Sequence, residues 1–162
     1  MNEESDENAL CKIAFAMDDE ADVESERFWA RRTESGSYIL ENVPFFVPGI
    51  AVEDEFLAEG HDDEAWATEL IGDGGHATVW VEGLERKHQK NHVLLAEVSL
   101  ELEKLGCYCE IESTNPRLAV DIESADNIDE IISLLYRLED AGKIGFAVAK
   151  TMDWLTALLR DE

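Results

Sequence analysis

The sequence predicts an α+β protein with a small β-rich, barrel-like N-terminal unit followed by a ferredoxin-like β-α-β-β-α-β unit and a short C-terminal helix. Before Glu82 the apolar residues recur with the period of two that is typical of strands. After Glu82, segments with the helical period of about 3.6 residues alternate with strand-like segments. We therefore divide the chain into an acidic tail (1–9), a β-rich unit (10–75), a ferredoxin-like unit (76–149) and a C-terminal helix (150–162).

Short alternating runs separated by turn residues predict the strands of the first unit. The runs are Ile13 to Met17, Arg27 to Arg32, Tyr38 to Asn42, Phe56 to Ala58 and Ala65 to Ile71. The following sequence GDGG supplies residues that tolerate positive φ. We expect it to form a tight hairpin between the last run and Ala77 to Glu82.

The apolar stretch from Val43 to Val52 does not have the pattern of a central strand. Its Pro44 and Pro48 cannot donate hydrogen bonds to a strand ladder. We expect a connection that crosses the core, with Phe45 or Phe46 and Ile50 filling an open end of the β unit. The alternative is an exposed binding edge.

The second unit is predicted from its order of elements. A helical stripe from His92 to Leu105 precedes a hairpin built on the runs 107–112 and 117–122, and a second stripe at 128–138 precedes the strand 144–148. A short helix at Met152 to Leu159 follows. Counting Ala77 to Glu82 as the first strand gives the split βαβ pattern, with two helices on one sheet face. We expect burial of Trp29, Phe45 or Phe46, Leu95, Ile111, Val120, Ile131, Leu135 and Phe146.

The chain resembles an uncharacterised bacterial family that is classified as a domain of unknown function. The similarity covers about residues 12 to 148 and is carried by the segments RFWARR, YILENVPFF, GIAVEDEF and GDGGHATVWVE. The family pattern falls on Glu26, Trp29, Ala30, Asn42, Pro44, Phe45, Phe46, Gly49 and Asp54. The resemblance implies a fold and no established chemistry. The acidity and the terminal helix of this chain depart from the pattern.

The sequence contains histidines and cysteines that could bind a metal or take part in catalysis. They form no complete catalytic or metal-binding motif. His88 and His92 have the spacing of a metal pair on a helix, but they lie in the cationic segment RKHQKNH. Cys107 and Cys109 alternate beside Ile111, which favours core thiols over a metal or redox pair. We expect no metal, no cofactor and no enzymatic activity.

Three carboxylates and one histidine are candidates for an acid pair in a cleft. Glu26, Asp54 and Glu69 could meet His76 in a cleft, but 38 acidic residues make chance proximity common. We expect these carboxylates to lie on a solvated surface.

The charge of the chain points to a class of partner. The formal net charge is −25, from 13 Lys and Arg against 38 Asp and Glu. Such a surface repels nucleic acid and anionic lipid and attracts basic proteins. We expect a non-catalytic acidic binding protein, an immunity or inhibitor protein that docks on a basic toxin or enzyme. The alternative is a small-molecule sensor or regulatory interaction domain.

The predicted partner-binding residues come from loop ends of the N-terminal half, where the negative charge is concentrated. They are Asp18, Asp19, Glu20, Asp22, Glu24, Glu53, Glu55, Asp62, Asp63 and Glu64. The start MNEESDEN lacks the features of a secretory signal, and no apolar run has the length of a membrane span. Three cysteines without metal or redox spacing suit a reducing compartment. We therefore expect a cytoplasmic protein.

Overall fold

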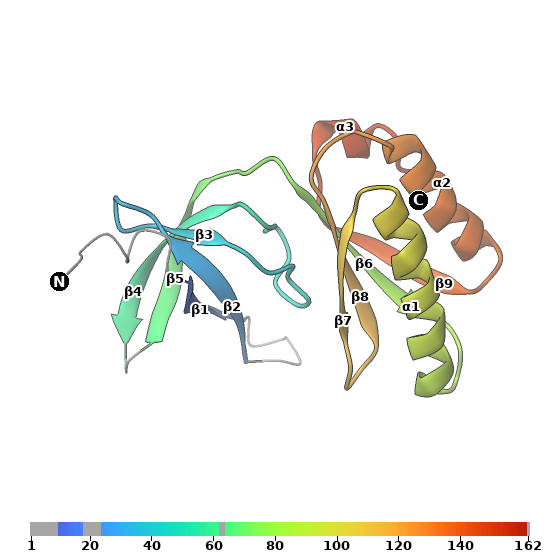
Figure 1. The fold of residues 1–162 in the computed structure, drawn as a ribbon, viewed down its shortest axis with the longest axis horizontal. Coiled ribbons are helices and arrows are strands. Elements are labelled where there is room, and N and C mark those ends of the chain that lie inside the picture. Colours follow the sequence, from blue (N-terminus) through green and yellow to red (C-terminus); the bar gives the residue numbers. More distant parts are fainter. Residues whose placement is uncertain (1–9, 18–23, 62–63, 162) are drawn as a thin grey trace. The chain divides into compact units, whose positions relative to one another are not determined.

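The computed structural model of the chain describes residues 10–17, 24–61 and 64–161. Its elements confirm the predicted α+β class, with a five-stranded barrel followed by an antiparallel sheet, two helices and a short C-terminal helix (Figure 1). The chain divides between Gly75 and His76 into two compact units. Among the described residues, none of the helices has the length and apolar character needed to cross a membrane.

The first unit is a closed barrel with its strands in sequence order. The strands are β1 (Leu10–Ala16), β2 (Ser25–Arg32), β3 (Tyr38–Leu40), β4 (Glu55–His61) and β5 (Glu64–Gly72). Successive strands pair antiparallel, so the first and fifth strands run in the same direction. The barrel therefore closes through a parallel pair, in which Ile13 lies opposite Ala65 and Ala14 opposite Trp66.

Alternate residues of the strands fill the barrel. The ring of Phe15 makes edge-to-face contacts with Phe28 at 5.2 Å and with Phe56 at 4.8 Å between ring centroids. Because Phe28 points inward, its neighbour Trp29 points outward and is 43% exposed. The prediction that Trp29 is buried is therefore wrong.

The apolar connection between β3 and β4 supplies part of the barrel core. Ile50 belongs to the buried cluster, and Val43 is also buried. Phe45 and Phe46 are only half-buried. Gly49 has φ +81, a conformation that side-chain-bearing residues rarely adopt, and it turns the chain back toward the barrel. The predicted core-filling role is confirmed for Ile50 and holds only partly for the two phenylalanines.

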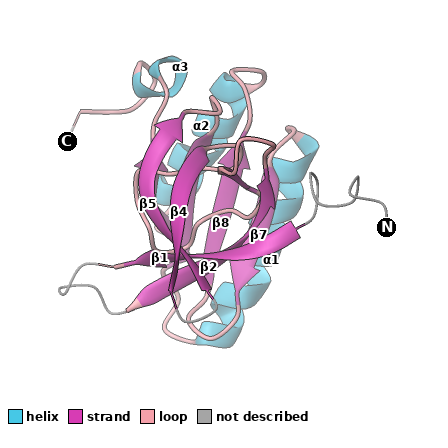
Figure 2. Ribbon diagram, turned by 90° about the vertical axis from the view of Figure 1, so that its left-hand side faces the viewer, coloured by secondary structure: helices cyan, strands magenta, loops and turns pink. Residues whose placement is uncertain are grey.

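The second unit has the predicted β-α-β-β-α-β order. Its elements are β6 (Ala77–Gly83), α1 (His88–Lys104), β7 (Tyr108–Glu112), β8 (Arg117–Ile122), α2 (Ile128–Asp140), β9 (Ile144–Lys150) and α3 (Asp153–Thr156). The sheet order is β7-β8-β6-β9, and every pair is antiparallel. Figure 2 shows α1 and α2 side by side on one face of this sheet.

The core of this unit lies between the helices and the sheet. Leu95, Val120, Ile131 and Leu135 are buried there, as predicted. Ile111 is 37% exposed, and the prediction that it is buried is wrong. Its strand β7 is the edge of the sheet, where a side chain is covered from one side only. Phe146 is half-buried against Tyr136, with ring centroids 5.1 Å apart.

One predicted turn and the bounds of two helices differ from the sequence-based expectation. The predicted GDGG hairpin is wrong, because β5 belongs to the barrel and β6 to the other sheet. Gly72 to Gly75 instead joins the two units. Helix α1 begins at His88, four residues before the predicted start, and α3 spans only Asp153–Thr156.

Candidate functional site

Glu26 on β2 holds the apolar connection through its backbone. Its Oε2 accepts the N–H of Phe45 at 2.8 Å, and its Oε1 accepts those of Phe46 and Val47 at 3.0 Å. Asn42 completes this arrangement, because its Oδ1 accepts the N–H of Trp29 at 2.7 Å. These two positions of the family pattern therefore build a loop. Pro44 leaves one fewer donor to satisfy in that loop.

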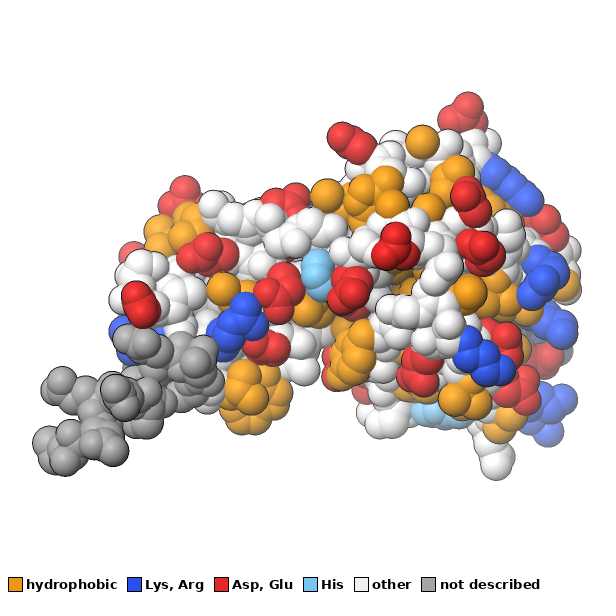
Figure 3. Space-filling model, turned by 45° about the horizontal axis from the view of Figure 1, so that its top comes forward, with side chains coloured by type: hydrophobic (Ala, Val, Ile, Leu, Met, Phe, Trp, Pro, Cys, Tyr) orange, Lys and Arg blue, Asp and Glu red, His pale blue; other side chains and the backbone are white. Residues whose placement is uncertain are grey.

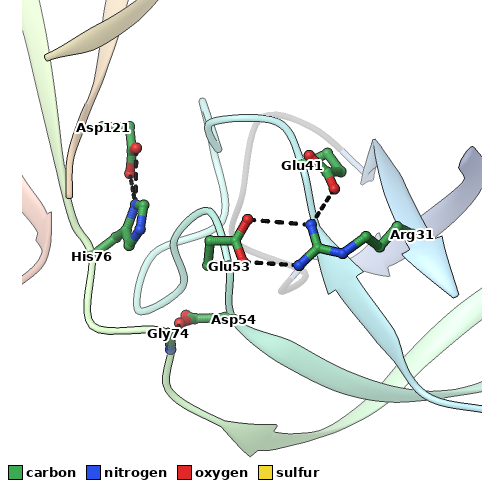
Figure 4. Close-up of polar contacts among 7 residues, drawn as sticks. All are labelled: Arg31, Glu41, Glu53, Asp54, Gly74, His76 and Asp121. Atoms are coloured by element: carbon green, nitrogen blue, oxygen red, sulfur yellow. Dashed lines mark hydrogen bonds and ion pairs between the residues drawn. The ribbon is translucent and has the colours of Figure 1, made fainter. Parts of the chain in front are cut away.

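Asp54 is fully buried and ties two further segments together. Its Oδ2 accepts the N–H of Ala51 at 2.9 Å. Its Oδ1 accepts the N–H of Gly74, also at 2.9 Å (Figure 4). Gly74 passes so close to Glu53 that a Cβ there would lie 2.5 Å from the Glu53 carbonyl carbon. Asp54 is therefore a structural anchor for the segment that leaves the barrel.

Arg31 neutralises two carboxylates beside this anchor. Its guanidinium bonds Glu41 at 2.5 Å and Glu53 at 2.9 and 3.3 Å (Figure 4). These bonds raise the pKa of Arg31 above its ordinary value, with the Glu53 bond as the largest cause. Glu53 also has φ 72, a strained conformation for a residue other than glycine.

Of the predicted partner-binding residues, most of those in the described part of the chain already have internal contacts. Glu53 pairs with Arg31, Glu55 accepts a hydrogen bond from Ser37, and Glu64 pairs with Arg27 at 2.6 and 3.0 Å. Glu24 is exposed. The remaining candidates, Asp18, Asp19, Glu20, Asp22, Asp62 and Asp63, lie outside the described residues.

The expectation that Glu26, Asp54 and Glu69 lie on a solvated surface holds for Glu69 and is wrong for Asp54, which is fully buried. Glu26 and Asp54 bind separate backbone segments, and Glu69 is exposed. His76 instead contacts both carboxylate oxygens of Asp121 through Nδ1 at 2.9 Å (Figure 4). Asp121 is only 5% exposed, so this pair keeps a carboxylate hydrogen-bonded where water has little access.

The predicted metal-spaced residues do not converge. His88 is exposed at the start of α1, and His92 contacts the carbonyl of Ser113 through Nε2 at 2.9 Å. Cys107 is buried and Cys109 is half-buried, and burial raises the pKa of both thiols to about 12, which favours the protonated form. Within residues 10–17, 24–61 and 64–161 no group of three His, Cys, Asp or Glu side chains could hold a metal ion.

The open face of the second sheet carries a contact among Trp80, Arg117 and Glu82 that the sequence did not predict. Trp80 alternates with the buried Val79 and Val81, so its ring lies on the face opposite the helices. Arg117 lies over this ring, with Cζ 4.9 Å from the centroid, and bonds Glu82. In the sequence, this contact is indicated only by Trp80, a large aromatic residue at a strand position where a polar residue is expected.

A hollow lies along α2. It measures about 480 Å³ and is lined by residues of the helix and of the C-terminal segment: Asp129, Ile132, Ser133, Tyr136, Arg137, Asp140, Leu158 and Arg160. Arg160 is held by a bidentate pair with Asp140 at 2.8 and 3.0 Å and lies 4.0 Å over the ring of Tyr136. Its backbone N–H donates to the Tyr136 hydroxyl at 2.7 Å, which fixes the end of the chain against α2.

Acidic side chains are spread over the surface that Figure 3 shows. They lie among apolar and neutral side chains in both units, and no single continuous acidic patch appears on this face. In the first unit the only Lys and Arg residues are Lys12, Arg27, Arg31 and Arg32, all on β1 and β2. The positive charge of this unit is therefore confined to one pair of neighbouring strands.

A barrel joined to a ferredoxin-like sheet, with loop-anchoring carboxylates in the first unit, defines a two-unit α+β class of protein. The chain belongs to the family Domain of unknown function (DUF4265), which matches residues 26–146. A crystal structure of a hypothetical protein from Neisseria gonorrhoeae has the same fold, with a TM-score of 0.69 and 18% sequence identity. The match covers 88% of this chain and 95% of that chain. No curated protein matches the sequence.

Proposed function

We propose that this protein is a non-catalytic, acidic binding protein, an immunity or inhibitor protein that docks on a basic toxin or enzyme in the cytoplasm. The observation that carries the proposal is the uncompensated negative charge. The net charge is −25, and three of the four Lys and Arg residues of the first unit already have internal contacts. Arg27 and Arg31 form internal ion pairs, and the Lys12 ammonium lies 4.4 Å over the Trp29 ring.

Because Arg27, Arg31 and Lys12 have these contacts, they do little to offset the exposed carboxylates of the first unit. Glu24, Glu34 and Glu69 are exposed there. A field of this sign accelerates the approach of a basic protein, and the acceleration falls as salt screens it. Docking then requires no chemistry on the inhibitor, only complementary charge and shape.

The ion pairs within the chain limit which of the predicted partner-binding residues can be neutralised in a test. Neutralising Glu53 would remove one of the two carboxylates bound to Arg31, and neutralising Glu64 would remove the carboxylate bound to Arg27, so either change would also disturb an internal contact. The test set is therefore Asp18, Asp19, Glu24, Asp62 and Asp63, each changed to Asn or Gln. A matched set in the second unit removes the same charge from exposed positions: Glu85, Glu97, Glu103, Glu123 and Asp126.

The experiment has two stages. The tagged protein is first used to isolate a stoichiometric basic partner from cells of its own source. Association rates with that partner are then measured between low and high salt for the wild type and both neutralised variants. We expect the first-unit variant to associate more slowly and with a weaker salt dependence than the second-unit variant. Equal rates and equal salt dependence in the two variants would refute the acidic docking surface.

The hollow along α2 supports a second candidate, a small-molecule sensor. Its volume of about 480 Å³ lies in the range of ligand sites, and it combines apolar Ile132 and Leu158 with the guanidinium of Arg137. A ligand that fits should raise the unfolding temperature by mass action. Thermal unfolding with a panel of small carboxylates, for wild type and Ser133→Trp, tests this. Stabilisation of the wild type alone would favour the sensor, and no stabilisation would remove it.

A further inference from the structure

The open face of the second unit's sheet contains a hollow beside Trp80. It measures about 350 Å³ and is lined by Trp80, Glu82, Arg117, Gly145, Phe146 and Ala147. All of these residues belong to β6, β8 and β9. The hollow is thus formed within one sheet, on the side opposite α1 and α2.

Strand register explains why the surface is hollowed here. Trp80 lies opposite Ala119 on β8 and Ala147 on β9, and Glu82 lies opposite Gly145. A large ring flanked by residues with little or no side chain leaves space beside it. Ala147 is exposed, so the space on the β9 side is open to solvent.

The contacts of Arg117 show that Trp80 and Glu82 can bind a guanidinium group together. Its guanidinium lies over the ring at 4.9 Å, and its Nε and Nη2 both donate to Glu82 Oε1, at 3.0 and 2.6 Å. The Glu82 side chain is 53% exposed, so solvent and a partner's side chain can reach its carboxylate. The carboxylate can therefore receive a second cation beside the ring.

The charge of this face also favours a cation. Glu82, Glu110 and Glu112 lie on it, and Arg117 bonds Glu82 and lies opposite Glu112. The backbone N–H groups of Asn115 and Thr114 lower the pKa of Glu112, with Asn115 as the larger cause, so this carboxylate stays ionised at neutral pH. Together with Asp121 on β8, four carboxylates stand against Arg117 and Lys150, which is on β9 opposite Thr78, so the face stays negative.

We propose that the hollow beside Trp80 receives a basic side chain, an arginine, of a protein partner. The inference rests on the proposed function and adds a contact point in the second unit. An arginine fits because its planar guanidinium stacks on an indole and donates to a carboxylate at the same time. Tryptophan and arginine are also the residue types that most often dominate the energy of protein interfaces.

The test uses the full chain and a defined probe. The peptide acetyl-Gly-Arg-Gly-amide is titrated into the ¹⁵N-labelled protein, and the indole N–H of Trp80 is followed after assignment with Trp80→Phe. The control peptide replaces Arg with citrulline, which has the same shape without the charge. We expect saturable shifts at Trp80, Gly145 and Ala147 with the arginine peptide and none with the citrulline peptide.

Three variants locate the binding. Ala147→Leu fills the hollow and should abolish the shifts, whereas Ala96→Leu makes the same change at an exposed position of α1 and should leave them intact. Glu82→Gln keeps the shape of the side chain and should weaken binding by about tenfold, because one charge-assisted hydrogen bond is lost.

The outcomes separate this inference from the proposed function. If Ala147→Leu binds the arginine peptide as the wild type does, or if shifts spread evenly over the acidic surface, the hollow is not an arginine site. That result leaves the comparison of the two neutralised variants unaffected. If the hollow binds arginine while the two neutralised variants associate equally with the basic partner, the docking surface of the first unit fails and the hollow stands.

Discussion

Glu26 accepts three backbone N–H groups of the connection between β3 and β4, and this contact gives a prediction at the scale of one residue. Glu26→Ala leaves these donors unpaired in a half-buried loop. We expect a loss of about 2 kcal/mol in the free energy of unfolding, measured by urea denaturation. Glu69→Ala, at an exposed carboxylate, should change stability by less than about 0.5 kcal/mol. Equal stabilities of the two variants would contradict the anchoring role.

The thiols of Cys107 and Cys109 give a second prediction for single residues. Burial raises the pKa of both from 9.0 to about 12. Above pH 9 the unfolded chain loses these protons while the folded chain keeps them, so stability should fall as pH rises from 9 toward 12. Cys107→Ala combined with Cys109→Ala should flatten this part of the curve of unfolding midpoint against pH. An unchanged slope in the double variant would assign the effect to other groups.

The same protonation governs chemical reactivity. At pH 8 almost all of each buried thiol is protonated, and the thiolate is the reactive form. We expect mass spectrometry to find both cysteines unmodified by iodoacetamide in the native protein and modified in urea. Modification of Cys109 at the rate of a free thiol would show that β7 opens readily.

At the scale of elements, the connection from β5 to β6 depends on a close backbone approach. A Cβ on Gly74 would collide with the backbone of Glu53, which cannot yield as a flexible side chain can. We expect Gly74→Ala to lower stability by about 1–3 kcal/mol in thermal or urea unfolding. Gly60→Ala serves as the control, since its Cβ would meet Glu64 O at 3.9 Å. A wild-type midpoint for Gly74→Ala would mean that this segment relaxes away from Glu53.

At the scale of the whole molecule, a net charge of −25 destabilises the compact state by self-repulsion. Salt screens this repulsion, so the unfolding temperature should rise between about 10 mM and 500 mM NaCl. Both five-residue neutralised variants should gain a few degrees at low salt and show a smaller rise with salt. A falling unfolding temperature would indicate that the attractive pairs, such as Arg31 with Glu53, outweigh the repulsion.

The sequence by itself determined the class of the fold and the order of its elements. Alternation around Phe15 and Phe28 and the helical stripe through Ile131 and Leu135 are local periodicities, and each identifies a strand or helix face without knowledge of its neighbours. The family pattern was likewise visible as a run of residues. Its predicted location agrees with the match to DUF4265.

Only the tertiary structure determines which hydrogen-bond and ion-pair partners the polar residues have. Glu26, Asp54 and Glu53 are equivalent in a list of 38 acids, and only the fold brings backbone N–H groups to the first two and Arg31 to the third. The glycine turn after β5 fits a hairpin locally, but long-range pairing placed its two flanking strands in different sheets. Trp80 meets Arg117 and the small residues of β9 only through strand register, because contacts between residues far apart in the chain leave no local pattern.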